Sequence, residues 1–173
     1  MKEKIWEEAI LKKLVDTGDV GSESVEYIRR HKVKISFGEF SKSTGAKWFL
    51  FQRIALNMRY FSMNTDLDDP ALLSLLVHEV HHLKQGVFLA LSVYGELDAW
   101  QVGYRFYKEI RPVQLAPVLE EILTLPLNWE RDNLRYAAKL MQDYAGKGYH
   151  INWLPLYPFY KELRYWLTRQ EGV

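Results

Sequence analysis

Residues 69–86 read DPALLSLLVHEVHHLKQG and form the best-capped helical pattern in the chain. Asp69 is of a residue type that caps helices, and Pro70 follows at the first helical position, where a missing backbone N–H costs nothing. Apolar residues then recur every three or four positions, which is typical of a helix with one buried face. Gly86 suits the position just after a helix end. The sequence therefore predicts a well-capped, partly buried helix over residues 70–85.

Within this helix, residues 78–82 form the pattern H-E-x-x-H. Positions i and i+4 lie one above the other on a helix face, so His78 and His82 can offer both imidazoles to one metal ion. Glu79 is rotated from that face and is placed to reach a water on the metal. Because zinc lowers the pKa of such a water, we predict Glu79 as the general base in its attack on a carbonyl. His81 lies off the ligand face and is predicted to be a surface or supporting histidine.

A catalytic zinc ion takes three protein ligands and leaves one position open, so a third ligand is expected downstream. We predict Glu96, near the start of a helix over residues 92–110 that runs back beside the first helix. Residues 87–91 must then be partly loop, with Ser92 as N-cap. The alternative for Glu96 is a solvated carboxylate favoured by the helix dipole. His150 is the only later histidine; with Tyr149 it is either a donor to an oxyanion or a capping pair.

The rest of the chain indicates two N-terminal helices, a small sheet and a helical remainder. The alternation of residues 33–37 and the apolar run of residues 48–58 are interpreted as an antiparallel pair of strands. Helices other than the two already described are predicted at about residues 3–15, 22–30, 116–124, 129–145 and 156–169. We expect one domain over residues 1–173, of the α+β class, predominantly helical, with a small antiparallel sheet beside the metal-binding helix.

The composition excludes several classes of protein. The 173 residues carry a formal net charge of +1, so no field of one sign points to a nucleic acid or membrane partner. The absence of cysteine excludes disulfides, thiolate metal sites and cysteine nucleophiles. No apolar stretch is long enough to span a bilayer and the N-terminus does not resemble a signal peptide, which favours a cytoplasmic location.

Residues 75–86, followed by Glu96-x-x-Ala99, resemble the zincin metalloproteases, and in particular the gluzincin type with an H-E-x-x-H-x-x-Q core. The resemblance covers about residues 70–105 and implies a zincin-like fold, one Zn²⁺ per chain and a peptide or protein substrate. It also implies that residues 47–57 form an edge strand that binds the extended substrate. Larger gluzincins carry an Asp that orients the first histidine; here position 100 is Trp, and Asp98 is a weak substitute.

The sequence leaves three functions open, beside the alternative of a structural protein in which the histidine pair is incidental. The first is a zinc-dependent peptidase of gluzincin type, with His78, His82 and Glu96 as ligands and Glu79 as general base. The second is a catalytically silent module that binds a peptide or partner at the same site. The third is a metallohydrolase that acts on another carbonyl, because the site activates water without specifying the substrate.

Overall fold

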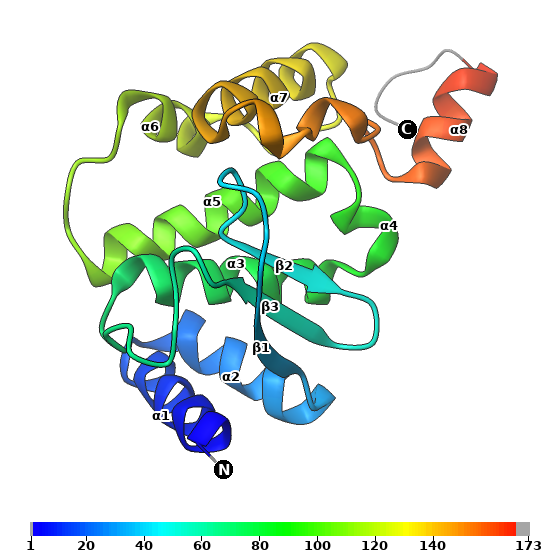
Figure 1. The fold of residues 1–173 in the computed structure, drawn as a ribbon. Coiled ribbons are helices and arrows are strands. Elements are labelled where there is room, and N and C mark those ends of the chain that lie inside the picture. The colour runs from blue at the N-terminus through cyan, green and yellow to red at the C-terminus, as the bar shows by residue number, and fades with distance from the viewer. Residues whose placement is uncertain (1, 169–173) are drawn as a thin grey trace.

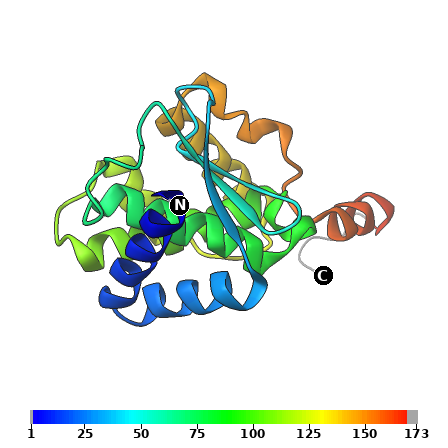
Figure 2. The same ribbon diagram turned by 60° about the horizontal axis from the view of Figure 1, so that its bottom comes forward.

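The chain is described by a computed structural model that covers residues 2–168. Its elements, in chain order, are α1 (Lys2–Asp16), α2 (Asp19–His31), β1 (Lys34–Gly38), β2 (Ala46–Phe49), β3 (Arg53–Asn57), α3 (Pro70–Gln85), α4 (Val87–Ala90), α5 (Val93–Ile110), α6 (Pro117–Thr124), α7 (Arg131–Ala145), the 3₁₀ turns η1 (Lys147–Tyr149) and η2 (Ile151–Trp153), and α8 (Phe159–Thr168). The fold is mostly helical with one small sheet, consistent with the α+β class (Figure 1). Helix α8 lies at the periphery in both ribbon views (Figures 1 and 2), with Glu162 and Tyr165 against Arg131 of α7.

The predicted helices are confirmed, and so are the caps on which two of them depend; residue 169, the predicted end of the last helix, lies outside the described residues. Asp69 accepts a hydrogen bond of 2.8 Å from the Ala71 backbone N–H, and Pro70 begins α3. The Ser92 hydroxyl accepts a hydrogen bond of 3.0 Å from the Gly95 backbone N–H and begins α5. Helix α2 begins at Asp19, three residues earlier than predicted, after Gly18 at φ 107°. None of the helices in residues 2–168 has the length and hydropathy that a bilayer-spanning segment requires.

The prediction of an antiparallel pair of strands is wrong, because the sheet is mixed and has three strands in the order β1-β3-β2. Strand β1 pairs parallel with β3, and β2 pairs antiparallel with β3. The run of residues 48–58 therefore contains most of a hairpin rather than one strand. Strand β3 lies in the middle, and its residues Ile54, Ala55 and Leu56 are fully buried. Strand β2 forms the edge that faces α3.

The hairpin turn explains why the sequence pattern predicted one strand where the structure has β2 and β3. Residues 50–52 carry none of the Gly, Asn, Asp or Pro residues that mark a turn in sequence. Phe51 and Gln52 nevertheless adopt φ values of 67° and 58°, in the left-handed region that favours glycine. Apolar Leu50 and Phe51 continue the pattern of β2 into the turn, so hydrophobicity alone does not separate the strands.

Two hydrophobic cores lie on opposite sides of α5. One packs α1, α2 and the sheet against α3 and includes Phe106 of α5. The other packs Val93, Leu97 and Trp100 of α5 against α6, α7 and η2. Helices α3 and α5 therefore form the centre of the molecule, with the sheet in front of α3 (Figure 1).

Asn57, the last residue of β3, holds the loop that follows β1. Its side chain is fully buried and donates to the backbone carbonyls of Ser41 and Thr44 at 3.0 and 2.6 Å. Its Oδ1 accepts from the Arg59 backbone N–H at 3.1 Å. One amide thus fixes the loop at residues 41–44 against the sheet.

We predict that Asn57→Asp lowers the free energy of unfolding by about 2–3 kcal/mol, because a carboxylate then faces two buried carbonyl oxygens without a donor. Urea unfolding measures the change. Asn64→Asp is the control, since Asn64 is exposed and should change stability little. Equal loss in both variants would contradict the role assigned to Asn57.

Candidate metal centre

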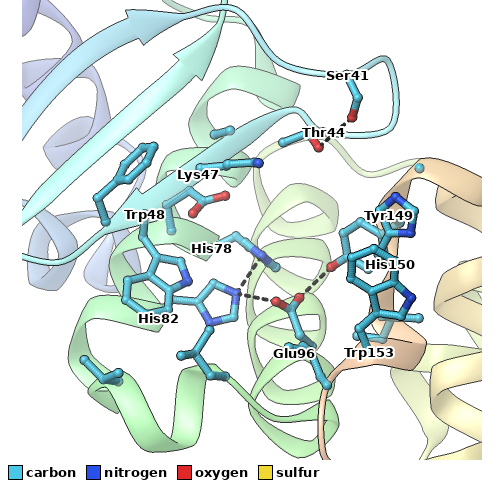
Figure 3. A pocket seen from close by; sticks show the side chains of 18 of the residues that line it. Ser41, Thr44, Lys47, Trp48, His78, His82, Glu96, Tyr149, His150 and Trp153 are labelled. Carbon is cyan, nitrogen blue, oxygen red and sulfur yellow. Dashed lines mark hydrogen bonds and ion pairs between the residues drawn. The ribbon is translucent and has the colours of Figure 1, made fainter.

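Helix α3 places His78, Glu79 and His82 at the centre of the molecule. Its apolar residues Leu72, Leu76 and Val80 are fully buried, which fixes the rotation of the helix about its axis. His82 and Glu79 are 2% and 3% exposed, so both are held inside the protein. The Nε2 atoms of His78 and His82 lie 3.1 Å apart, as the i, i+4 spacing predicts (Figure 3).

Helix α5 brings Glu96 to the two histidines. Glu96 Oε1 lies 3.6 Å from His82 Nε2, and its side chain is 15% exposed. The ligand atoms of His78, His82 and Glu96 all lie within 4.8 Å of one another. The three residues predicted as ligands are therefore brought together, with Glu96 on a different helix from the histidine pair (Figure 3).

The connection between the two helices makes this approach possible. The four-residue helix α4 takes up residues 87–90, where the sequence predicted partial loop. Gly95 lies so close to this segment that a Cβ would meet the Leu89 carbonyl oxygen at 2.0 Å. Only glycine fits at this position, immediately before Glu96.

The three residues fit a zinc ion by distance and by ligand type. Two ligand atoms about 2.1 Å from one tetrahedral zinc lie about 3.4 Å apart. The observed separations of 3.1 Å and 3.6 Å are close to this value. Two histidines and one glutamate, with an open fourth position, also form the donor set of catalytic zinc sites. His78, His82 and Glu96 would hold the ion.

Glu79 lies beside this cluster with an unsatisfied oxygen. Its Oε2 is buried and has no hydrogen-bond partner among the residues that the structure describes. Burial raises the pKa of Glu79 to about 7; His82 and the Trp48 backbone lower it, and Glu96 raises it. A buried carboxyl with such a pKa exchanges a proton near neutral pH, which suits a general acid or base.

The imidazoles and Glu96 share one electrostatic environment. Burial, together with His82, lowers the pKa of His78 to about 3. Burial alone would raise the pKa of Glu96, but the neighbouring His82 lowers it to about 2. Glu96 is thus a carboxylate and His78 a neutral imidazole, the forms in which both groups bind metals.

A hydrogen-bond network behind His82 fixes the orientation of its ring. His82 Nδ1 lies 3.0 Å from Gln85 Oε1, and the Gln85 amide donates to Asp98 and to the Gly95 carbonyl, each at 2.9 Å. His81 Nε2 lies 2.7 Å from Asp98 Oδ2, so His81 supports the site without joining the ligands. Asp98 contacts a ligand only through Gln85. Gln85, one turn after His82 in the sequence, thus orients the second histidine of the motif, a role that the sequence analysis did not assign to it.

Tyr149 holds the second oxygen of Glu96. Its hydroxyl donates to Glu96 Oε2 at 2.5 Å and accepts from Trp100 Nε1 at 2.6 Å. The other oxygen, Glu96 Oε1, faces His82. Trp100, which stands where larger gluzincins carry an Asp, contacts Glu96 only through Tyr149. The sequence named Tyr149 only as a companion of His150, because nothing local links residues 96 and 149. His150 itself is exposed, stacks on Trp153 and has φ 58°.

Two cavities meet at the cluster. One, of about 780 Å³, is lined by β2, His82, Glu96, residues 87 and 91, and the 148–154 segment. The other, of about 870 Å³, is lined by residues 42–46, one face of α3 and α5, and several tyrosines. His78, Glu79 and Tyr149 border both. Of the predicted edge strand at residues 47–57, only β2 lies at the sheet edge beside this site, because β3 is the central strand.

Comparison with known proteins supplies no relative. Searches against family models, curated proteins and solved structures found no match to this chain.

We predict that Tyr149→Phe lowers zinc affinity about 10-fold, because Glu96 loses the hydrogen bond that orients it. Competition with a zinc indicator dye measures the affinity. Tyr136→Phe is the matched control, since Tyr136 is exposed and hydrogen-bonds to Glu121 on the surface. Unchanged affinity in Tyr149→Phe would show that the ligand is oriented by other contacts.

Proposed function

We propose that this protein is a zinc-dependent peptidase of gluzincin type, with one zinc ion per chain. The observation that carries the proposal is a carboxyl with an unsatisfied buried oxygen, Glu79, beside three potential ligands on two helices. The resemblance of residues 70–105 to the zincins supports the same activity and the same type of fold.

His78, His82 and Glu96 hold the metal in this proposal. When bound, zinc lowers the pKa of water and polarises a carbonyl group. Gln85 fixes the His82 ring, and Tyr149 fixes the Glu96 carboxylate. These contacts keep the ligand set rigid, which a catalytic metal site requires.

Glu79 moves the proton. Its Oε2 accepts a proton from the attacking water and later gives that proton to the leaving amine. A pKa near 7 suits both steps, because the carboxyl can both accept and release a proton near neutral pH. Burial is the main cause of this pKa, so the same environment that isolates Glu79 from bulk water tunes its acidity.

Strand β2 holds the substrate. It is an edge strand that borders the metal site, so an extended peptide can add to it through main-chain hydrogen bonds. The two cavities extend from His78 and Glu79 in different directions, which leaves room for the chain on each side of the cleaved bond. A peptide or protein substrate in the cytoplasm, without nucleic acid or membrane, completes the proposal.

We expect Glu79→Gln to bind zinc like the wild type but to cleave peptides about 1,000-fold more slowly, because the general base is lost. A fluorogenic peptide library on zinc-loaded protein measures cleavage. Glu3→Gln is the control, since Glu3 is exposed on α1, a helix that contributes no residue to the site. Full activity in Glu79→Gln would contradict the mechanism, and peptide binding without turnover in the wild type would indicate a binding module.

We also expect zinc to raise thermal stability. A ligand present at 1,000 times its dissociation constant stabilises the native state by about 4 kcal/mol. Differential scanning fluorimetry of metal-free protein with and without added zinc measures the shift. His82→Ala should show no shift, whereas the control His31→Ala, which changes an exposed histidine, should respond like the wild type. A shift in His82→Ala would place the zinc elsewhere.

A further inference from the structure

Apolar side chains are exposed around the mouth of the smaller cavity. We call them the apolar rim; they are 38% to 96% exposed and comprise Leu50, Phe51, Val87, Phe88, Leu91 and Trp153. Scattered exposed apolar residues are common, but a group at the entrance to a site indicates an interaction surface.

The apolar rim continues into the cavity that holds the ligands. Leu50, Val87, Leu91 and Trp153 line that cavity together with His82 and Glu96. Phe51 and Phe88 do not line the cavity; they follow Leu50 and Val87 in the chain and are 96% and 65% exposed. The hairpin turn and α4 lie on the same side of the molecule (Figure 1), and Trp153 lies on the opposite side of Glu96 from His82 (Figure 3).

The turn that presents Phe51 is not built for stability. Phe51 is 96% exposed, and both Phe51 and Gln52 have positive φ values. A glycine or asparagine would adopt this backbone with less strain, and a polar residue would be better solvated. Strained backbone with an exposed aromatic ring is typical of a segment retained for binding.

The chemistry around the apolar rim indicates what it binds. Glu79 and Glu96 are the only carboxylates among the described residues that line the cavity, and both belong to the metal centre. The remaining charged or titratable lining residues outside the centre are Lys47 and His150, together with Tyr149. Lys47 is exposed on β2, and a lysine on an edge strand opposes pairing with a second copy of the same edge.

We propose that the apolar rim binds an extended apolar segment of the polypeptide substrate, on one side of the cleaved bond. This inference rests on the proposed peptidase function and specifies its substrate class. Apolar segments of this kind are buried in folded proteins and become accessible in unfolded or flexible ones. The substrates are therefore expected to be non-native or flexible stretches of protein.

Binding of two fluorescein-labelled dodecapeptides tests the proposal. One alternates leucine with serine, and the other replaces each leucine with asparagine. Fluorescence anisotropy is measured on Glu79→Gln protein, with and without zinc, so that hydrolysis does not consume the probe. The leucine peptide is expected to bind at least about 10-fold more tightly than the asparagine peptide.

A triple variant removes the apolar rim, and a matched triple variant controls for loss of exposed apolar surface. Phe51→Ser, Phe88→Ser and Trp153→Ser together should abolish the preference for the leucine peptide. Ile5→Ser, Met63→Ser and Tyr136→Ser together change exposed residues elsewhere and should leave the preference intact. Equal affinities in the two triple variants would overturn the proposal.

Two single variants separate binding from strain in the turn. Phe51→Gly and Gln52→Gly both relieve a positive φ, so neither should lower the midpoint of thermal unfolding. Phe51→Gly should lower the affinity for the leucine peptide several-fold. Gln52→Gly retains the Phe51 ring and should bind this peptide as tightly as the protein without either change. A loss of affinity in both variants, or in neither, would contradict the role of Phe51.

Failure of this inference is distinguishable from failure of the proposed function. Peptide binding through the rim without zinc binding or turnover would reject the peptidase and retain the binding surface. Zinc binding and turnover with no effect of the rim variants would retain the peptidase and reject the inference. Light scattering that shows a dimer converted to a monomer by the rim variant, with peptide affinity unchanged, would assign the rim to a second copy and overturn the proposal.

Discussion

The contact between α3 and α5 is the constraint on which the site depends. The two helices run back along each other: Gln85 near the end of α3 bonds to Gly95 at the start of α5, and a Cβ on Gly103 would lie 3.2 Å from the Cβ of His78. A larger residue at position 103 would have to displace its neighbours on α3 by a few tenths of an ångström, so glycine favours this close packing. The packing sets the separation of 3.6 Å between His82 and Glu96, which side-chain rotation alone could not produce from more distant helices. Packing thus decides whether three polar residues can act as one ligand set.

The packing of α3 against α5 brings ionisable groups together in the buried interior. Two carboxyls and two imidazoles from α3 and α5 lie close together in space, and isolated charges at such burial are costly. A divalent cation balances the two carboxylates while the imidazoles remain neutral, so the proposed zinc form has no net charge at the centre. Burial raises the pKa of Glu79 to about 7, although His82 and Lys47 both lower it, so the nearby cationic side chains do not offset the burial of this carboxyl. The electrostatic argument and the donor set therefore favour the same occupant.

The features that could be predicted from the sequence are those encoded over one or two helical turns. These local features are the caps at Asp69 and Ser92, the histidine spacing and the helix end at Gly86. Helices α3 and α5 form where these features predict them. The mixed sheet could not be predicted in this way, because the turn at Phe51 lacks turn-forming residues and strand pairing depends on long-range packing. Tyr149 could not be placed either, since its hydrogen bond to Glu96 joins residues 53 positions apart. Tertiary contacts, not local pattern, supply the groups that support the ligands.

Strand β2 lies at a sheet edge where the stability of the fold and access for a substrate favour different residues. An edge strand beside an open cavity is a hazard for a soluble protein, and natural sheets protect such edges with charge or with covering elements. Lys47 provides a charge on β2, but Trp48 and Phe49 stay partly exposed, and the following turn presents Phe51 to solvent. A sequence selected for stability alone would have polar residues in this turn and would cover the exposed edge of β2. Retaining an accessible edge and an apolar mouth next to Glu79 is reasonable if an extended polypeptide is held there, because the same groups that lower the stability of the free protein then contribute to binding.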